Sequence, residues 1–250
     1  MEIVIIGSGN VASHLVKAFQ QSNIHIKQLF GRNETDLQKL SENFSIPYST
    51  TNIEKADLYI ISVSDRAVEE VSKSIPFKDC LVVHTSGSLP IESLKGDFRK
   101  ASFYPLQTFS KTKDLDYNKI PFFIEAENDD DQNILLSLAK KVSEKVMIST
   151  FEKRKYIHIT AVFACNFVNH LFARAKEISD AQEIPFDYFI PLIDETVEKI
   201  HTVNPKDAQT GPAVRNDNRI LELHKGLIDS EEHLKIYHTM NGSIKKMYNL

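Results

Sequence analysis

The sequence predicts an α/β fold with a doubly wound, mostly parallel sheet, followed by an all-α C-terminal domain. Two observations lead to this prediction. In residues 1–150, short apolar runs alternate with segments whose apolar residues recur at helical spacing. Such alternation is typical of parallel strands joined by right-handed helical crossovers. Beyond residue 150, strand patterns nearly vanish and only helical periodicity continues. We therefore expect two domains, 1–152 and 153–250.

The expected strands are short apolar runs, and the expected helices are longer amphipathic segments. Along the chain the strands are 3–6, 24–30, 58–63, 81–84, 101–104, 122–125 and 146–148. The helices between them are 11–19, 36–44, 66–75 and 130–142. The C-terminal domain carries four helical patterns, 156–184, 186–203, 217–228 and 231–248, with Pro185 closing the first.

Composition excludes several classes of function. The 250 residues include 30 basic and 34 acidic side chains, so no basic excess marks a nucleic-acid or membrane partner. Two cysteines, Cys80 and Cys165, are too few for a disulfide scaffold, and the nine histidines form no metal-site pattern. The most apolar run, Leu58 to Val63, falls far short of the about 20 residues that span a membrane. With no signal-peptide pattern at the start, we expect a cytoplasmic protein.

A glycine-rich motif follows the first predicted strand. Residues 7–12 read Gly-Ser-Gly-Asn-Val-Ala, which matches G-x-G-x-x-A between a strand and an amphipathic helix. In a dinucleotide-binding (Rossmann) fold, the first glycine permits the tight turn and the second brings the backbone close to the diphosphate. The helix N-terminus then faces the phosphates. We expect Gly7, Ser8, Gly9, Asn10 and Val11 to bind the cofactor; the alternative is a plain glycine turn.

The end of the second strand indicates which dinucleotide binds. NAD-binding proteins usually place Asp or Glu about 20 residues after the fingerprint, to hold the ribose hydroxyls. Here the chain reads Phe30-Gly31-Arg32-Asn33. A guanidinium suits a 2′-phosphate, so the sequence favours NADP(H) over NAD(H), held by Arg32 and Asn33. Alternatively, Arg32 is a solvated loop charge and Asn33 caps the next helix.

Further strand ends border the same edge of the sheet. Ser64 follows the strand at 58–63, and Ser86 lies in the turn after the strand at 81–84. Because open α/β sheets bind ligands outside the carboxyl ends of their strands, we expect both serines to contact the cofactor. His84 is either a buried histidine or a site residue.

Four stretches, 84–88, 104–109, 158–166 and 210–212, together with the fingerprint, resemble a known superfamily. The chain is similar to the 6-phosphogluconate dehydrogenase-like and pyrroline-5-carboxylate reductase-like proteins. Within that group it resembles bacterial Rossmann-like NADP oxidoreductases with an uncharacterised helical C-terminal domain. The resemblance implies a helical domain that forms a homodimer. These relatives usually carry a histidine before the proline of the second stretch, whereas this chain has Tyr104, whose hydroxyl can still donate a hydrogen bond.

Polar residues in the C-terminal half supply the remaining site candidates. His158 and Asn166 share one stripe of a predicted helix, and Asn166 interrupts an apolar run. The resemblance implies that this helix contacts substrate and nicotinamide; alternatively, Asn166 is a buried amide satisfied by the backbone or by a partner subunit. Arg215 follows the Thr210–Pro212 loop and is either a substrate clamp or part of a surface pair with Asp217.

The function we expect is hydride transfer between NADP(H) and a small carbonyl or imine in a cleft between the two domains. The candidate catalytic residues are Tyr104, His158 and Asn166, and Gln107 and Arg215 are candidate substrate contacts. Val162 stands four residues before Asn166, where β-hydroxyacid dehydrogenases use lysine, which argues against their chemistry. The alternative function is a non-catalytic NADP-binding or sensing protein. A methyltransferase that uses the same glycine-rich loop is less favoured, because it would need an acidic residue at the end of the second strand, near the position of Arg32.

Overall fold

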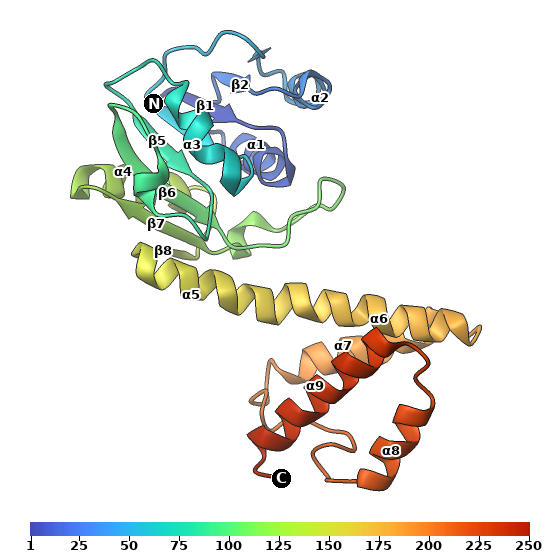
Figure 1. Cartoon of the computed structure of the whole chain (residues 1–250). Helices are drawn as coiled ribbons and strands as arrows, with labels where there is room; N and C mark the ends of the chain where they lie inside the picture. Colours follow the sequence, from blue (N-terminus) through green and yellow to red (C-terminus); the bar gives the residue numbers. More distant parts are fainter. The chain divides into compact units, whose positions relative to one another are not determined.

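The computed structural model describes residues 1–250 and divides them into two compact units, Met1–Asn166 and Phe167–Leu250. The first unit contains one eight-stranded sheet with the order β3-β2-β1-β4-β5-β6-β7-β8 (Figure 1). All neighbouring strands are parallel except β6 and β7, which pair antiparallel. The strands are β1 (Ile3–Ile6), β2 (Gln28–Phe30), β3 (Tyr48–Ser49), β4 (Leu58–Ile61), β5 (Leu81–His84), β6 (Arg99–Pro105), β7 (Phe122–Ala126) and β8 (Val146–Ile148). The predicted doubly wound α/β fold is therefore confirmed.

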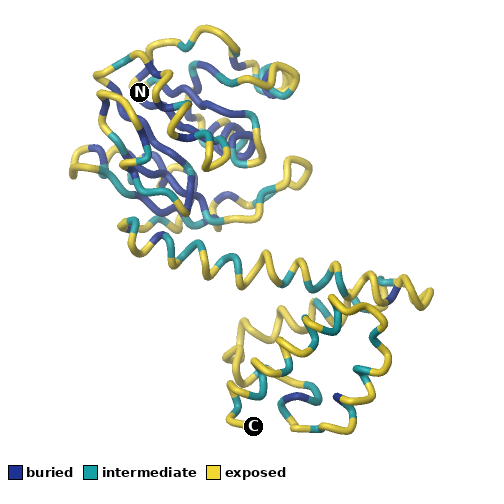
Figure 2. Tube along the Cα trace, in the orientation of Figure 1, coloured by how far each residue is buried: buried dark blue, intermediate teal, exposed yellow.

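Alternation along the strands separates two cores, one on each face of the sheet. Ile3 and Ile5 of β1 belong to a core that also contains residues of α1 (Asn10–Gln21), α2 (Glu34–Phe44) and α4 (Asp129–Lys140). Val4 and Ile6 face the opposite core, which contains Val68 of α3 (Asp65–Lys73). Strands β1, β4 and β5 are buried along their whole length (Figure 2), because parallel strands covered on both faces are apolar throughout. At the edge of the sheet, Met147 and Ile148 of β8 are exposed.

The second unit is entirely helical. It contains α6 (Val168–Ala181), α7 (Ile190–Lys199), α8 (Asn218–Gly226), α9 (Glu231–Met247) and one 3₁₀ turn, η4 (Phe186–Phe189). Its buried residues are Ser179, Ala213 and Leu221. Figure 2 shows the rest of the unit as exposed or intermediate. An all-helical C-terminal region was expected from the sequence, but its scarcity of buried apolar residues was not.

Several predicted element boundaries were wrong. The long helix starts at Phe151 rather than 156, because Thr150 caps it by accepting a hydrogen bond from the Lys153 N–H. It runs as α5 (Phe151–Ala161), a π-helical turn (Val162–Phe167) and α6. Only 28–30 of the expected strand 24–30 pair with a neighbour, and β3 was not predicted because two residues carry no periodicity. The helix expected at 186–203 begins as the 3₁₀ turn η4.

The helix that begins at Phe151 is also a candidate membrane span by its length and composition. Residues Phe151–Ala181 form a helix that is long and apolar enough to cross a bilayer by length and composition. This helix was not expected as a candidate span from the sequence, because charged and polar residues interrupt its apolar runs. Core helices of soluble proteins meet the same criterion, so length and composition alone do not separate a membrane span from a helix that packs against protein.

His84 is a fully buried histidine at the end of β5. Its Nδ1 atom accepts a hydrogen bond from the Ser86 N–H at 3.2 Å. Burial lowers the pKa of His84 to about 3, the positive charge of Arg154 acts in the same direction, and the Pro90 carbonyl opposes the shift. The ring is therefore neutral at physiological pH, and it accepts a hydrogen bond from the backbone of the turn that follows β5.

This lowered pKa predicts acid sensitivity of the fold. An unfolded histidine takes up its proton near pH 6.5, whereas folded His84 takes it up near pH 3. Between these pH values, His84 is protonated in the unfolded state but not in the folded state. The contribution of neutral His84 to the free energy of unfolding is therefore full above pH 6.5 and is lost as the pH falls. The loss is about 1.4 kcal/mol per pH unit. Urea unfolding from pH 7 to pH 4 measures this slope. His84→Gln should flatten it and the exposed His25→Gln should not; equal slopes in both variants would contradict the assignment.

Candidate functional site

A pocket of about 750 Å³ lies at the carboxyl ends of β1, β2, β4 and β5. Its walls come from the turns after these strands, from Tyr104 of β6 and from His158 of α5. Every lining residue belongs to the first unit. Doubly wound sheets bind ligands at this edge, and the volume suits a small-molecule or cofactor site.

All of the residues that the sequence predicted to bind the cofactor line this pocket. They are Gly7, Ser8, Gly9, Asn10, Val11, Arg32, Asn33, Ser64 and Ser86. Tyr104 and His158, predicted as catalytic residues, line it as well. The structure thus brings two groups of residues that lie far apart in the sequence to one pocket.

Glycine is needed at the two fingerprint positions, Gly7 and Gly9, for different geometric reasons. Gly7 has a φ of +123°, and a Cβ atom there would lie 2.2 Å from the Ser62 carbonyl oxygen. The tight turn after β1 therefore requires glycine at this position. Gly9 is the N-cap of α1 and has an extended backbone, and a Cβ atom there would meet nothing within 4 Å. The space beside Gly9 is an open cradle at a helix N-terminus, which fits a diphosphate group.

The β2 end of the pocket is cationic. Arg32 is exposed and forms no ion pair. Asn33 caps α2 by accepting a hydrogen bond from the Asp36 N–H at 3.1 Å, which is the capping role considered as its alternative. The uncommitted guanidinium of Arg32 is therefore the group at this end that fits a phosphate.

At the other end of the pocket, Tyr104 and His158 meet above a glycine. The Tyr104 hydroxyl lies 3.1 Å from Nδ1 of His158. A Cβ atom on Gly87 would lie 2.9 Å from each of these two atoms and 2.7 Å from the Tyr104 ring. Any side chain at position 87 would therefore disturb the pair, so the close approach of the turn depends on glycine.

Tyr104 is a neutral hydrogen-bonding group under physiological conditions. Only 8% of its surface is exposed. Burial raises its pKa to about 12; the charge of Arg154 opposes the shift and the Asp65 carboxylate adds to it. The hydroxyl therefore keeps its proton at neutral pH, and it can donate or accept a hydrogen bond inside the pocket.

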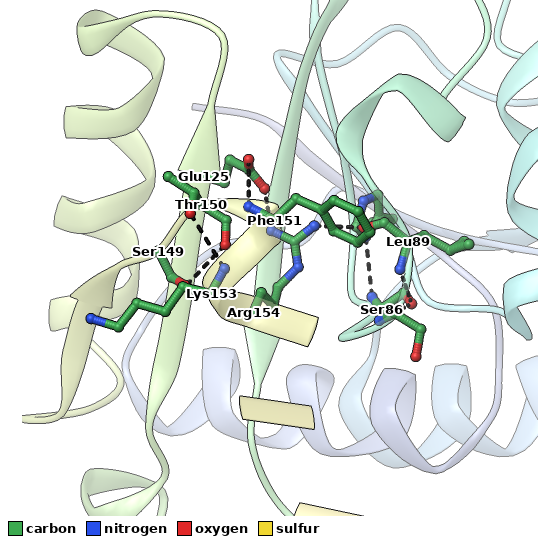
Figure 3. Close-up of polar contacts among 10 residues, drawn as sticks. Ser86, Leu89, Glu125, Ser149, Thr150, Phe151, Lys153 and Arg154 are labelled. Atoms are coloured by element: carbon green, nitrogen blue, oxygen red, sulfur yellow. Dashed lines mark hydrogen bonds and ion pairs between the residues drawn. The ribbon is translucent and has the colours of Figure 1, made fainter. Parts of the chain in front are cut away.

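A buried ion pair fixes the segments that carry these groups (Figure 3). Arg154 of α5 is fully buried and donates to a Glu125 carboxylate oxygen on β7 and to the Leu89 carbonyl. The other Glu125 oxygen accepts the Phe151 N–H at 2.9 Å, at the start of α5. Arg154 thereby ties α5 both to the sheet and to the turn that follows β5.

Two serines shape the turns of the pocket. The Ser86 hydroxyl accepts hydrogen bonds from the backbone N–H groups of Ser88 (3.0 Å) and Leu89 (3.2 Å). Its oxygen therefore holds the turn that carries Gly87 in place. Ser64 is the N-cap residue of α3, and its side chain makes no capping hydrogen bond. Its hydroxyl stays available to the pocket.

Three predicted site residues do not line this pocket. Asn166 is exposed within the π-helical turn, so the amide that the apolar run had led us to expect inside a helix packing face is open to solvent here. Gln107 is exposed, and its side-chain oxygen accepts the Thr108 N–H. Arg215 is exposed and forms no ion pair, while Asp217 caps α8 by accepting the Ile220 N–H.

Two residues that hold the site together, Glu125 and Arg154, were not identified from the sequence. A signal existed for Arg154, which stands four residues before His158 and therefore shares its helix face. Glu125 closes an apolar strand, where a carboxylate needs a partner. Neither signal identifies that partner, because the two residues lie 29 positions apart.

Two family models match most of the chain. Residues 120–244 match the model of a domain of unknown function (DUF2520), and residues 2–87 match the model described as NADP oxidoreductase coenzyme F420-dependent. A search of functionally curated proteins gives no match.

Solved structures extend the similarity to the whole chain. A protein titled "putative NADP oxidoreductase" from Bacteroides fragilis is 38% identical, with 98% of each chain covered and a TM-score of 0.93. Pyrroline-5-carboxylate reductase from Streptococcus pyogenes is 16% identical, with 100% of this chain and 99% of that chain covered and a TM-score of 0.67. A reductive aminase from Aspergillus terreus, solved with NADPH and ethyl-5-oxohexanoate, is 11% identical, with 98% and 92% covered and a TM-score of 0.70. The latter two show a shared fold.

The fingerprint glycines provide a matched pair of variants. Gly7→Ala should destabilise the fold by about 3 kcal/mol, since it combines a positive φ with a backbone clash. Gly9→Ala should lower the free energy of unfolding by only about 0.5–1 kcal/mol, yet weaken NADPH binding by about tenfold or more because the methyl group fills the cradle. Urea unfolding and calorimetric titration measure the two effects. A Gly9→Ala variant that binds NADPH as the wild type does would contradict the cradle.

Proposed function

The chain belongs to a family of NADP oxidoreductases that carry the DUF2520 domain, and we propose that it transfers hydride between NADP(H) and a small carbonyl or imine compound. One observation carries the proposal: a single pocket holds the fingerprint glycines, a free arginine at the β2 end and the Tyr104–His158 pair at the β6 end. The strand order β2-β1-β4-β5-β6 separates these ends by roughly 19 Å at the usual strand spacing. A dinucleotide has two chemically distinct ends, as this pocket does.

The residues present fit the cofactor along its length. Arg32 would hold the ribose 2′-phosphate, beside Asn33, whose side chain caps α2. The backbone beside Gly9 would hold the diphosphate. Ser64 and the turn around Ser86 would border the nicotinamide. When bound, NADPH supplies the hydride, and the chain's own groups orient the substrate and manage its proton.

Tyr104 and His158 are the groups we assign to the proton. The Tyr104 hydroxyl would donate a hydrogen bond to the carbonyl oxygen or imine nitrogen of the substrate and polarise it. A proton on Nδ1 of His158 would be donated to the Tyr104 oxygen, so that the hydroxyl hydrogen is free to pass to the substrate. Asn166, Gln107 and Arg215 lie outside this pocket, and their expected roles stay predictions, as does the expected cleft between domains 1–152 and 153–250.

Variants of the pair test catalysis separately from cofactor binding. Tyr104→Phe and His158→Gln should each lower kcat by about 100-fold, while the Kd for NADPH stays within about twofold because neither residue holds the phosphates. The assay follows NADPH absorbance over a panel of aldehydes, ketones and cyclic imines. Tyr156→Phe, on the exposed side of the same helix, should match the wild type.

Two outcomes would count against this assignment. Wild-type activity in both Tyr104→Phe and His158→Gln would exclude the pair as proton donor. NADPH binding without turnover on any substrate of the panel would favour the non-catalytic NADP-binding or sensing protein.

We also propose that the helical unit forms a homodimer in the cytoplasm. Apart from Ser179, only Ala213 and Leu221 are buried within its 84 residues. Large apolar side chains are exposed on α7 and α8 and just after α8, among them Leu192, Val197, Leu223 and Leu227. An apolar groove of about 320 Å³ is lined by residues of α6, η4 and α7. A unit of this size needs a larger core, and the same surface on a second copy would supply it.

Sedimentation equilibrium tests the dimer. The wild type should have twice the mass of one chain, and Leu192→Glu should dissociate because it places a charge in the apolar groove. Asp194→Asn, an exposed polar change on the same helix, should remain dimeric. A monomeric wild type, or one that is soluble only with detergent, would contradict the proposal; the second result would favour a membrane role for Phe151–Ala181.

A further inference from the structure

The segment 107–116, between β6 and the 3₁₀ turn η2 (Tyr117–Lys119), lies along helix α1 (Figure 1, green). Three side chains of α1 hold it. Asn10 Nδ2 donates to the Phe109 carbonyl at 2.9 Å, His14 Nε2 lies 2.8 Å from the Ser110 carbonyl oxygen, and Lys17 pairs with Asp114 at 3.2 Å. Positions 10, 14 and 17 share one face of the helix. The fingerprint helix therefore positions this segment.

The middle of the segment contacts the first turn of α2, which follows the β2 end of the pocket. Lys111 Nζ lies 2.9 Å from a carboxylate oxygen of Asp36, in the first turn of α2. The same oxygen accepts a hydrogen bond from Asn33 Nδ2 at 3.1 Å. Asn33 lines the pocket beside Arg32. The ammonium group of Lys111 is thus linked through Asp36 to the group that borders the predicted 2′-phosphate site.

The Lys111–Asp36 ion pair contributes little to the stability of the fold. Lys111 and Asp36 are partly exposed, and ion pairs of this kind contribute about 0–1 kcal/mol. Their charges matter more for what binds nearby. A lone carboxylate at this end would suit a ribose 2′-hydroxyl, as in NAD-binding proteins, and would repel a phosphate. Lys111 neutralises that carboxylate, so the negative charge of Asp36 no longer opposes the binding of a phosphate to Arg32.

We propose that Lys111 is a specificity-determining residue that, together with Arg32, makes the pocket prefer a ribose 2′-phosphate over a 2′-hydroxyl. Asp36 holds the lysine in place before the cofactor arrives, and the phosphate recruits the ammonium group when it binds. This inference rests on the proposed cofactor. It adds a residue from a distant segment, 75 positions from Asp36 in sequence, to a site otherwise formed by the turn after β2.

Two small probes isolate the 2′-phosphate. Adenosine 2′,5′-bisphosphate and adenosine 5′-monophosphate differ only in that group, and calorimetric titration of the full chain gives a Kd for each. The wild type should prefer the bisphosphate. Lys111→Ala should reduce this preference by about tenfold, the value typical for loss of one charged hydrogen bond. Lys113→Ala changes an exposed lysine on the same segment that forms no ion pair, and it should keep the wild-type preference.

A double variant distinguishes an effect of the Asp36 charge on binding from a general disturbance of the fold. Lys111→Ala combined with Asp36→Asn removes the unmasked carboxylate, so it should recover part of the lost preference. If Lys111→Ala and Lys113→Ala both keep the wild-type preference, the inference about Lys111 is overturned while the cofactor assignment stands. If the wild type itself shows no preference, the NADP assignment and the inference fail together.

Discussion

The placement of polar groups in the pocket depends on one ion pair, between the fully buried Arg154 of α5 and the partly exposed Glu125 of β7. A buried guanidinium without a partner costs several kcal/mol, so the two segments cannot separate without exposing or stranding a charge. The same arginine donates to the Leu89 carbonyl, and the same glutamate accepts the first N–H of α5. Sheet, turn and helix are therefore fixed at one point. His158 lies one helical turn beyond Arg154, and this geometry brings its ring beside Tyr104.

The pocket combines rigid backbone with chemically different ends. Turns after four parallel strands form its walls, and buried strands leave these turns little freedom to move. Glycine occurs where the backbone must turn tightly or where another group comes close, at Gly7 and Gly87. The cationic end is tied to α2, and the Tyr104–His158 end is tied to α5. Cofactor recognition and proton transfer thus rest on separate elements of one unit.

Local signals allowed the sequence to predict the fold and half of the site. The fingerprint, the strand ends and Arg32 are each recognised within a few residues of a strand, and all of them line the pocket. Contacts between distant positions gave no such signal. Arg154 with Glu125 and Lys111 with Asp36 are joined across 29 and 75 positions, and periodicity does not report such pairings. The start of α5 was missed because its first turn, from Phe151 to Arg154, is charged and carries no apolar stripe.

A crystal structure of the protein with NADP⁺ tests the central claim most directly. We expect the 2′-phosphate beside Arg32, the diphosphate in the cradle at Gly9, and the nicotinamide between Ser64 and the Tyr104–His158 pair. A cofactor whose nicotinamide lies away from Tyr104, or whose 2′-phosphate contacts neither Arg32 nor its neighbours, would contradict it.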